Sequence, residues 1–481
     1  MKKSSLWLSA LGALGIAVAL AGCGKTFYFA GRTLPPSGLR NRVLVAIQNA
    51  SAANRGSLQI LDAYYDIRYA YNNVNTTFSI SGYSGALPIT IQNMPEEQVG
   101  AVYGSGDGSL VLADYEKESS SGAQKGLNGL SSSVFITRSK GFIFAASQAT
   151  HVFTVVDNSS GGTFALNLPG VYRVSVNPGG SAALAFVENS NYAYYPVKLS
   201  ASQTLSFSGG PGTWPKAAVD CEPQNAPAWC LFQAQSPDAV DATGTSYGAP
   251  LVFDRPVKAL FSNDGSTAYV LNCGAECGGT TSSISLLPVG PIIFTQNQGS
   301  GKLPSTGAIP NIPIPGGSSN ALIASSTMYV VGQQLLSDGL FTGNLTIVNL
   351  SNNTAGSSIS ISDGAPGAMS RIIQADDNTL WIGMTKCTNG ERFAKGLAYG
   401  CLTVFDTSAG AVKMLEPYQG DATGIAAVES LHKVYVAEGG QVYVYTTTDG
   451  RALNNQYVTV TGTAYDVAYM DGVTDANNTV Y

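Results

Sequence analysis

Charged residues are scarce in this chain. Asp, Glu, Lys and Arg make up 12% of its 481 residues, about half of the share usual in globular proteins. The formal net charge is -6 and the sequence contains no cluster of Lys and Arg, which argues against nucleic acid as a partner. The chain has two histidines, His151 and His432, and no cluster of metal-binding or catalytic residue types surrounds either. This composition disfavours catalysis, and we expect neither a cofactor nor a metal.

Long hydrophobic runs are missing as well. The apolar run from Leu11 to Leu20 is too short to span a membrane, which requires about 20 apolar residues. It follows Lys2 and Lys3 and ends in small residues, which is the pattern of a secretory signal. No long amphipathic helix follows it, whereas glycine is abundant, with 55 residues. Few charges and many turn-forming residues are typical of an all-β protein outside the cytoplasm.

The signal ends in Leu20-Ala-Gly-Cys23, which resembles the lipobox of bacterial lipoproteins. In that family the cysteine becomes the lipidated first residue of the mature protein. The resemblance implies a signal peptide over residues 1–22 and a membrane anchor on Cys23, followed by a tether over residues 23–40. Lipoproteins kept at the inner membrane commonly carry Asp at mature position two. Gly24 stands there, so we expect an outer-membrane lipoprotein if the organism has two membranes.

The six cysteines that remain after Cys23 fall into three local pairs. An even number of cysteines in an exported chain is typical of disulfides. The simplest connectivity joins neighbours in the sequence, and a zinc site at the second pair is the alternative. Neither histidine lies near that pair in the sequence, so disulfides are preferred. The predicted pairs are Cys221–Cys230, Cys273–Cys277 and Cys387–Cys401.

A pattern of paired strands recurs from about residue 41 onward. An apolar strand is followed, after a variable gap, by a second alternating strand that often closes in Asp or Asn. Alternation with a period of two predicts half-buried strands, and the Asn, Asp and Gly residues in the turns accept positive φ. Units of this kind, spaced by roughly 40 to 60 residues, are typical of a β-propeller. Seven units begin at Arg42, Gly141, Ser181, Thr267, Thr327, Thr379 and Lys433.

The seven units predict an all-β propeller of seven blades, with eight as the alternative. Residues 97–113 look like half a blade, and residues 214–253 are either a divergent blade or a long insertion. Residues 463–472 look like the first strand of a unit with nothing after it, whereas the first unit begins at its second strand. We therefore expect the C-terminal strand to complete the first blade, because closure removes exposed sheet edges. The propeller is assigned to residues 41–472 and a C-terminal tail to residues 473–481.

The repeated unit resembles that of the YVTN-type propellers. The matching segments are Ser262-Asn-Asp-Gly265, Tyr435-Val-Ala-Glu438, Val155-Val-Asp157 and Val404-Phe-Asp406. Proteins of that group include surface-layer proteins, envelope lipoproteins and, more distantly, lactonases of the phosphogluconolactonase type. With the anchor, the resemblance implies a binding or scaffold protein of the cell envelope, with an envelope protein or polysaccharide as partner. The alternatives are a lactonase-like hydrolase with its site in the central channel and, less favoured, a quinone-dependent dehydrogenase.

Tyrosines are the candidates for a binding surface. Exposed aromatic side chains at a rim stack on sugars or anchor a protein partner. The patch selected for binding contains Tyr64, Tyr65, Tyr69 and Tyr71. The alternative is that these side chains pack within strands.

Acidic residues at the ends of strands and the two histidines are the remaining candidates. Converging carboxylates would favour a hard cation, whereas an Asp at a strand end more often caps its own turn. We expect His151 to bond to the backbone at a strand edge and His432 to be a solvated turn residue. Capping is the preferred role for Asp62, Asp114, Asp157 and Asp406.

Overall fold

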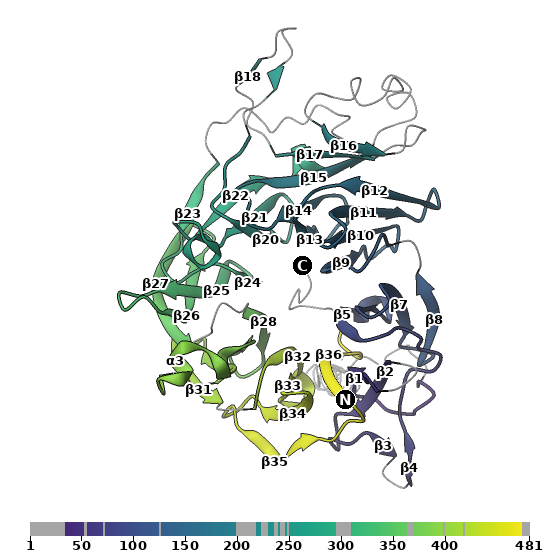
Figure 1. Cartoon of the computed structure of the whole chain (residues 1–481). Helices are drawn as coiled ribbons and strands as arrows, with labels where there is room; N and C mark the ends of the chain where they lie inside the picture. Colours follow the sequence, from purple (N-terminus) through teal and green to yellow (C-terminus); the bar gives the residue numbers. More distant parts are fainter. Residues whose placement is uncertain are drawn as a thin grey trace, which may run out of the picture.

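The structure of this chain is a computed structural model. Most of its regular structure consists of β-strands (Figure 1). Within the described residues, no helix is long and apolar enough to cross a membrane. Eight antiparallel sheets surround a common axis, so the chain is a β-propeller of eight blades (Figure 1). The structure describes residues 34–51, 55–70, 73–124, 127–198, 218–222, 229–234, 239–240, 246–247, 250–294, 309–362, 369–397, 400–416 and 419–473.

Each blade has its first strand nearest the axis and the following strands successively farther out (Figure 1). Blade 1 contains β36 (Thr463–Tyr469), β1 (Arg42–Gln48) and β2 (Gly56–Asp62). Blade 2 contains β5 (Pro88–Met94), β6 (Val99–Gly104), β7 (Ser109–Asp114) and β8 (Ser119–Gln124). Blade 3 contains β9 (Ser133–Ile136), β10 (Phe142–Ser147), β11 (Val152–Asp157) and β12 (Gly162–Asn167). Blade 4 contains β13 (Val171–Val176), β14 (Ala183–Val187), β15 (Ala193–Lys198), β17 (Trp229–Gln233) and β16 (Ala218–Glu222).

The other four blades each have four strands in chain order. Blade 5 contains β20 (Pro256–Phe261), β21 (Thr267–Asn272), β22 (Ser283–Pro288) and β23 (Asn311–Pro313). Blade 6 contains β24 (Asn320–Ala324), β25 (Thr327–Leu335), β26 (Phe341–Asn349) and β27 (Thr354–Ser362). Blade 7 contains β28 (Met369–Ala375), β29 (Thr379–Met384), β30 (Leu402–Asp406) and β31 (Ala411–Glu416). Blade 8 contains β32 (Ala422–Val428), β33 (Lys433–Glu438), β34 (Gln441–Thr446) and β35 (Ala452–Val458). Two short hairpins lie outside the blades, β3 (Tyr69–Ala70) with β4 (Asn73–Thr77) and β18 (Ala239–Val240) with β19 (Ser246–Tyr247).

Apolar side chains from adjacent blades form the core. Trp381 of β29 is fully buried and its ring lies 5.7 Å from that of Tyr445 in the next blade. Trp229 of β17 is likewise buried, with its ring 5.7 Å from that of Phe142 in blade 3. A blade buries both of its faces only between two neighbours, so the packing is complete only when the ring closes.

The C-terminal strand closes the ring, as predicted. β36 pairs with β1 in antiparallel register, with Val467 opposite Val45. Next to this joint, Arg42 is buried and its Nη2 lies 2.6 Å from Asp471 Oδ1. Its Nη1 donates to Glu118 Oε1 in blade 2 at 2.9 Å, and Ser37 Oγ donates to the same oxygen at 2.6 Å. The segment before β1, the residue Asp471 after β36 and the turn before β8 therefore meet around one buried guanidinium.

The predicted count of seven blades is wrong, and the alternative of eight is confirmed. Residues 88–124 form a complete blade where the sequence indicated half of one. Its first strand alternates only briefly, with Ile89 and Ile91 on either side of Thr90, and was not recognised as part of a unit. Its last strand begins with three serines and lacks the apolar alternation that identifies a strand. Within residues 214–253, the described strands β16 and β17 extend blade 4 to five strands, so this part of the chain belongs to blade 4.

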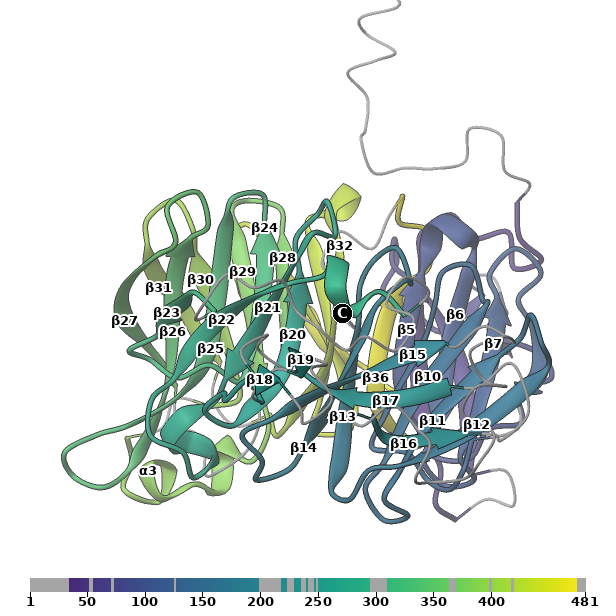
Figure 2. The ribbon, with the colours of Figure 1, turned by 90° about the horizontal axis from the view of Figure 1, so that it is seen from above.

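The turns between strands lie on two opposite faces of the ring (Figure 2). The face that carries Ser37, η1 (Pro95–Glu97) and η5 (Glu429–Leu431) is called the tether face. The face that carries η2 (Gly274–Cys277), η4 (Cys387–Asn389) and α3 (Glu391–Ala394) is called the disulfide face. A further single turn, η3 (Gly290–Ile292), follows β22. All three predicted disulfides are present, two of them on the disulfide face.

Candidate functional site

Very few charges occur on the strands that surround the axis. The innermost strands are β36, β5, β9, β13, β20, β24, β28 and β32. In the described structure these strands contain four charged side chains, one on each of four strands. They are Arg173, Lys258, Arg371 and Asp466, and together they are called the axial site. Three of the four are cationic in a chain whose net charge is -6.

Asp466 is the anionic member of the axial site and is engaged by the protein itself. Its Oδ2 lies 2.6 Å from Arg371 Nη2 and accepts a hydrogen bond from the backbone N–H of Ile91 at 2.8 Å. Burial raises the pKa of Asp466, and the Arg371 guanidinium opposes this shift. Arg371 Nη2 also lies 3.5 Å from Thr90 Oγ1. This pair joins blades 7 and 1, and it leaves the charges of Arg173 and Lys258 without a carboxylate of the inner strands beside them.

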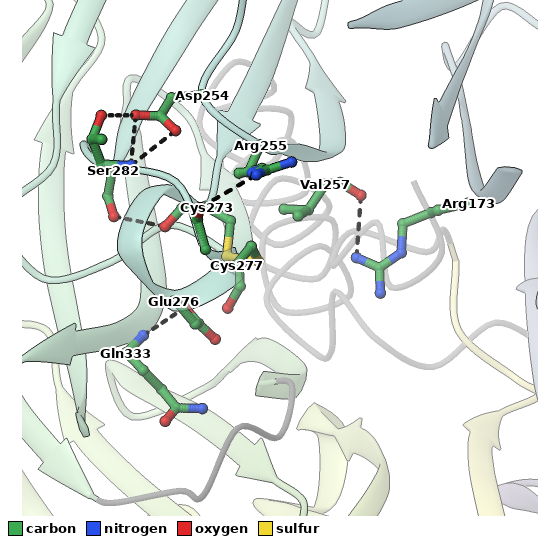
Figure 3. Close-up of a disulfide and its surroundings, with 12 residues drawn as sticks. Arg173, Asp254, Arg255, Val257, Cys273, Glu276, Cys277, Ser282 and Gln333 are labelled. Carbon is green, nitrogen blue, oxygen red and sulfur yellow. Dashed lines mark hydrogen bonds between the residues drawn. A yellow bond between two sulfur atoms is a disulfide. The ribbon is translucent and has the colours of Figure 1, made fainter. Parts of the chain in front are cut away.

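Lys258 and Arg173 extend from the inner strands of blades 5 and 4. Lys258 Nζ donates to the neutral Asn320 Oδ1 at 3.0 Å. Arg173 donates to the carbonyl oxygen of Val257 at 3.4 Å (Figure 3), and its guanidinium carbon lies 5.6 Å from the ring centroid of Tyr172. Burial and, next, the charges of Arg173 and Arg371 lower the pKa of Lys258 to about 7. The site is therefore cationic, and Lys258 titrates near neutral pH.

The predicted tyrosine patch is only partly a surface. Tyr64 and Tyr65 are exposed by 63% and 50%, and their rings meet edge to face at 4.9 Å. Tyr69 is half-buried in the short hairpin that follows blade 1. Tyr71 and the predicted lipid-bearing Cys23 lie outside the described residues. The patch remains a candidate contact surface, separate from the axial site.

The acidic residues at strand ends cap their own turns, which is the role that the sequence favoured for them. Asp62, Asp114, Asp157 and Asp406 each end the third strand of a blade. Their carboxylates accept hydrogen bonds from backbone N–H groups two or three residues later, at 2.8 to 3.0 Å. They do not converge on the axis, so they form no common cation site.

The two histidines have different roles. His151 Nδ1 accepts a hydrogen bond from the backbone N–H of Gly170 at 3.2 Å, as expected. His432 is 61% exposed, but its Nδ1 pairs with Asp376 and lies 3.3 Å from Asp377 Oδ2. One ligand atom from each of these three residues lies within 4.8 Å of the others, so they could hold a metal ion. The prediction of a merely solvated His432 is therefore incomplete, because its partners lie on the turn of the preceding blade.

The comparisons with known proteins support the fold of this chain and do not assign it to a family. No protein-family model matches the chain, and no curated protein matches it. Among solved structures, the dihydro-heme d1 dehydrogenase NirN in complex with DHE matches with a TM-score of 0.51 and 12% identity, covering 92% of this chain and 79% of that chain. A putative 6-phosphogluconolactonase from Bacteroides fragilis matches with a TM-score of 0.44 and 10% identity, covering 89% and 97%. Identities this low establish similarity to β-propellers and leave the function to be argued from this chain's own residues.

Proposed function

We propose that this chain is a lipid-anchored propeller of the cell envelope that binds a small anion on its axis. The observation that carries the proposal is the charge of the inner strands. The inner strands carry three cations and one carboxylate in an otherwise acidic protein, and that carboxylate already pairs with Arg371. A bound carboxylate, sulfate or phosphate group would supply the negative charge that no carboxylate of the inner strands provides to Arg173 and Lys258.

The lowered pKa of Lys258 makes the proposed binding sensitive to pH. Burial lowers the pKa of Lys258 to about 7, so its side chain gains and loses its proton near neutral pH. An anion beside Nζ favours the ammonium form and raises this pKa, so binding is coupled to proton uptake. Affinity should therefore fall as the pH rises above 7.

The test measures anion binding to the purified mature protein by isothermal titration calorimetry. Sulfate and succinate are suitable probes because their charges change little between pH 6.5 and pH 8.5. We expect binding at pH 6.5 to be about tenfold tighter than at pH 8.5. Lys258→Met should weaken binding at pH 6.5 by a similar factor and abolish the pH dependence, whereas Lys413→Met, at an exposed lysine of β31, should change neither. Equal affinity in Lys258→Met and the parent protein would refute the axial proposal.

The anchor is tested separately by fractionating cells. Cys23→Ser removes the residue that is expected to be lipidated and should move the protein from the membrane fraction to the soluble fraction. Continued membrane association of a folded Cys23→Ser protein would contradict the lipoprotein assignment.

A lactone hydrolase is the less favoured function. Hydrolysis at the axis requires a general base or a metal-bound water. On the described inner strands, the acidic side chain is Asp466, which is buried and paired with Arg371. An engaged carboxylate is a poor base, so we favour binding over catalysis.

A further inference from the structure

A cavity opens on the disulfide face, away from the axial site. It has a volume of about 660 Å³, which is within the range of small-molecule sites. Its wall is formed by the turn after β14, the segment that leads into β20 and the loop between β21 and β22. Figure 3 shows this wall around Asp254, Arg255 and the Cys273–Cys277 disulfide. The lining residues that matter for the argument are Asn191, Asp254, Arg255, Asn272, Ser283 and Ser285.

Asn272 provides an unused hydrogen-bonding group in this lining. The residue is 1% exposed, and its Nδ2 donates to Ser283 Oγ at 3.0 Å and to Ser285 Oγ at 2.8 Å. Its Oδ1 is buried and accepts no hydrogen bond within the described part of the protein. A buried carbonyl oxygen without a hydrogen bond destabilises the protein, because it has lost its hydration and gained no partner. A donor from a bound molecule would remove this destabilisation.

The two charged residues of the lining have opposite charges, and each is hydrogen-bonded by neutral groups of the protein. Asp254 accepts hydrogen bonds from the backbone N–H and hydroxyl of Thr280 and from the backbone N–H of Thr281. These bonds lower the pKa of Asp254 against the opposing effect of burial. Arg255 donates to the carbonyl oxygens of Asn189 and Gly278, while its Nε is buried without a hydrogen-bond partner among the described residues. The cavity therefore offers one unused acceptor and one unused donor, with no excess charge.

We propose that this cavity binds a neutral polyhydroxylated ligand of the saccharide type. A hydroxyl group both donates and accepts, so sugar hydroxyls match Asn272 Oδ1 and Arg255 Nε together. A small anion gains no net attraction here, because the charges of Asp254 and Arg255 in the lining offset each other. A purely apolar ligand would leave both buried polar atoms unsatisfied, which is costly.

The wall of the cavity is held in shape before any ligand arrives. The Cys273–Cys277 disulfide closes the turn at η2, and Ser282 Oγ donates to the carbonyl oxygen of Cys273 at 2.8 Å. Gly279 lies so close to Asp254 that a Cβ atom there would collide with the carboxylate. A preorganised wall reduces the entropy that binding must overcome.

The test is a saccharide-binding measurement on the full mature protein, using maltose, lactose and N,N′-diacetylchitobiose as probes. Saturation-transfer NMR identifies any disaccharide that binds, and calorimetry gives its affinity. We expect Asn272→Leu to weaken binding at least tenfold. Because this variant could fail to fold, Val252→Trp serves as a second one: Val252 is 72% exposed on the lining, so a bulky ring obstructs the entrance without disturbing the core.

The matched control is Val219→Trp, at a valine of β16 that is 42% exposed and lies outside the lining. It should bind the same disaccharide with unchanged affinity. The proposal is overturned if none of the three disaccharides binds, or if the folded Val252→Trp protein binds as tightly as the parent. Preferential binding of the anionic sugar glucuronate over the neutral probes would also overturn it.

Discussion

Glu276 shows how a single residue couples the fold to pH. Its Oε2 accepts a hydrogen bond from the backbone N–H of Gln333 in blade 6 at 2.8 Å (Figure 3). Burial raises the pKa of Glu276 to about 7, and the hydrogen bond from Gln333 opposes the shift. Between the ordinary pKa of 4.5 and about 7, the folded protein therefore holds a proton that the unfolded chain has released. Stability contributed by this proton is present below pH 4.5 and is lost as the pH rises through 7.

Glu276→Gln should remove this pH dependence. We expect the free energy of unfolding to be unchanged at pH 4.5 and to increase by about 1–3 kcal/mol at pH 8. Urea denaturation at the two pH values measures the difference. Glu116→Gln, at an exposed turn, is the control and should show no such pH-dependent gain. A uniform effect of Glu276→Gln at both pH values would show that folding does not raise the pKa of Glu276.

At the scale of elements, the disulfides stabilise loops that have little regular structure of their own. Cys387 and Cys401 are buried and enclose η4 and α3. The enclosed loop also contacts blade 6, because Arg392 Nε donates to the carbonyl oxygen of Phe341 and Nη2 lies 3.0 Å from Asp338 Oδ1. The loop is therefore attached to the propeller at both its ends and its middle.

Replacing both Cys387 and Cys401 by Ser should lower the free energy of unfolding by about 2–4 kcal/mol, because the disulfide restricts the unfolded chain across a separation of 14 residues. Guanidinium denaturation of the two proteins under non-reducing conditions gives the value. The strands of blade 7 should keep their hydrogen-exchange protection, because their ladder does not depend on the loop. An unchanged denaturation midpoint would mean that the packing around Arg392 alone holds the loop.

For the whole molecule, Arg42 is the residue on which ring closure converges. It is 1% exposed and makes ion pairs with Asp471 after the last strand and with Glu118 of blade 2. Its Nη1 also donates to the carbonyl oxygen of Tyr115 at 2.6 Å. Both carboxylates would be left buried without their partner if the guanidinium were removed.

Arg42→Met should therefore destabilise the protein by about 3–5 kcal/mol. Hydrogen exchange followed by mass spectrometry should show the largest loss of protection in β1 and β36, where the ring closes. Arg451→Met, at an arginine whose side chain is 78% exposed, should leave both stability and exchange unchanged. Exchange that accelerates equally in all blades would show that the ring unfolds as one unit instead of opening at this joint.

Local features of this protein could be predicted from the sequence by itself. The strands follow from alternation, the capping role of Asp157 and Asp406 from their place before a turn, and the disulfides from cysteines separated by 4 to 14 residues. Closure by the C-terminal strand was also predictable, because a strand left alone at one end requires a partner at the other. Each of these predictions depends on residues that are neighbours in the sequence or on a simple count of strands.

Only the tertiary structure decided the number of blades and the composition of the sites. Blade 2 is a full blade because the short alternation of β5 is extended by pairing with β6, and the serine-rich β8 is held as a strand by pairing with β7. Arg173, Lys258, Arg371 and Asp466 come from four different blades. Asn191 of blade 4 joins Asn272 and Arg255 of blade 5 in the lining of one cavity. Pairing of consecutive strands is a short-range property of the chain. The axial site instead combines residues from four blades and the cavity combines residues from two, and these residues become neighbours only once the blades have packed into the ring.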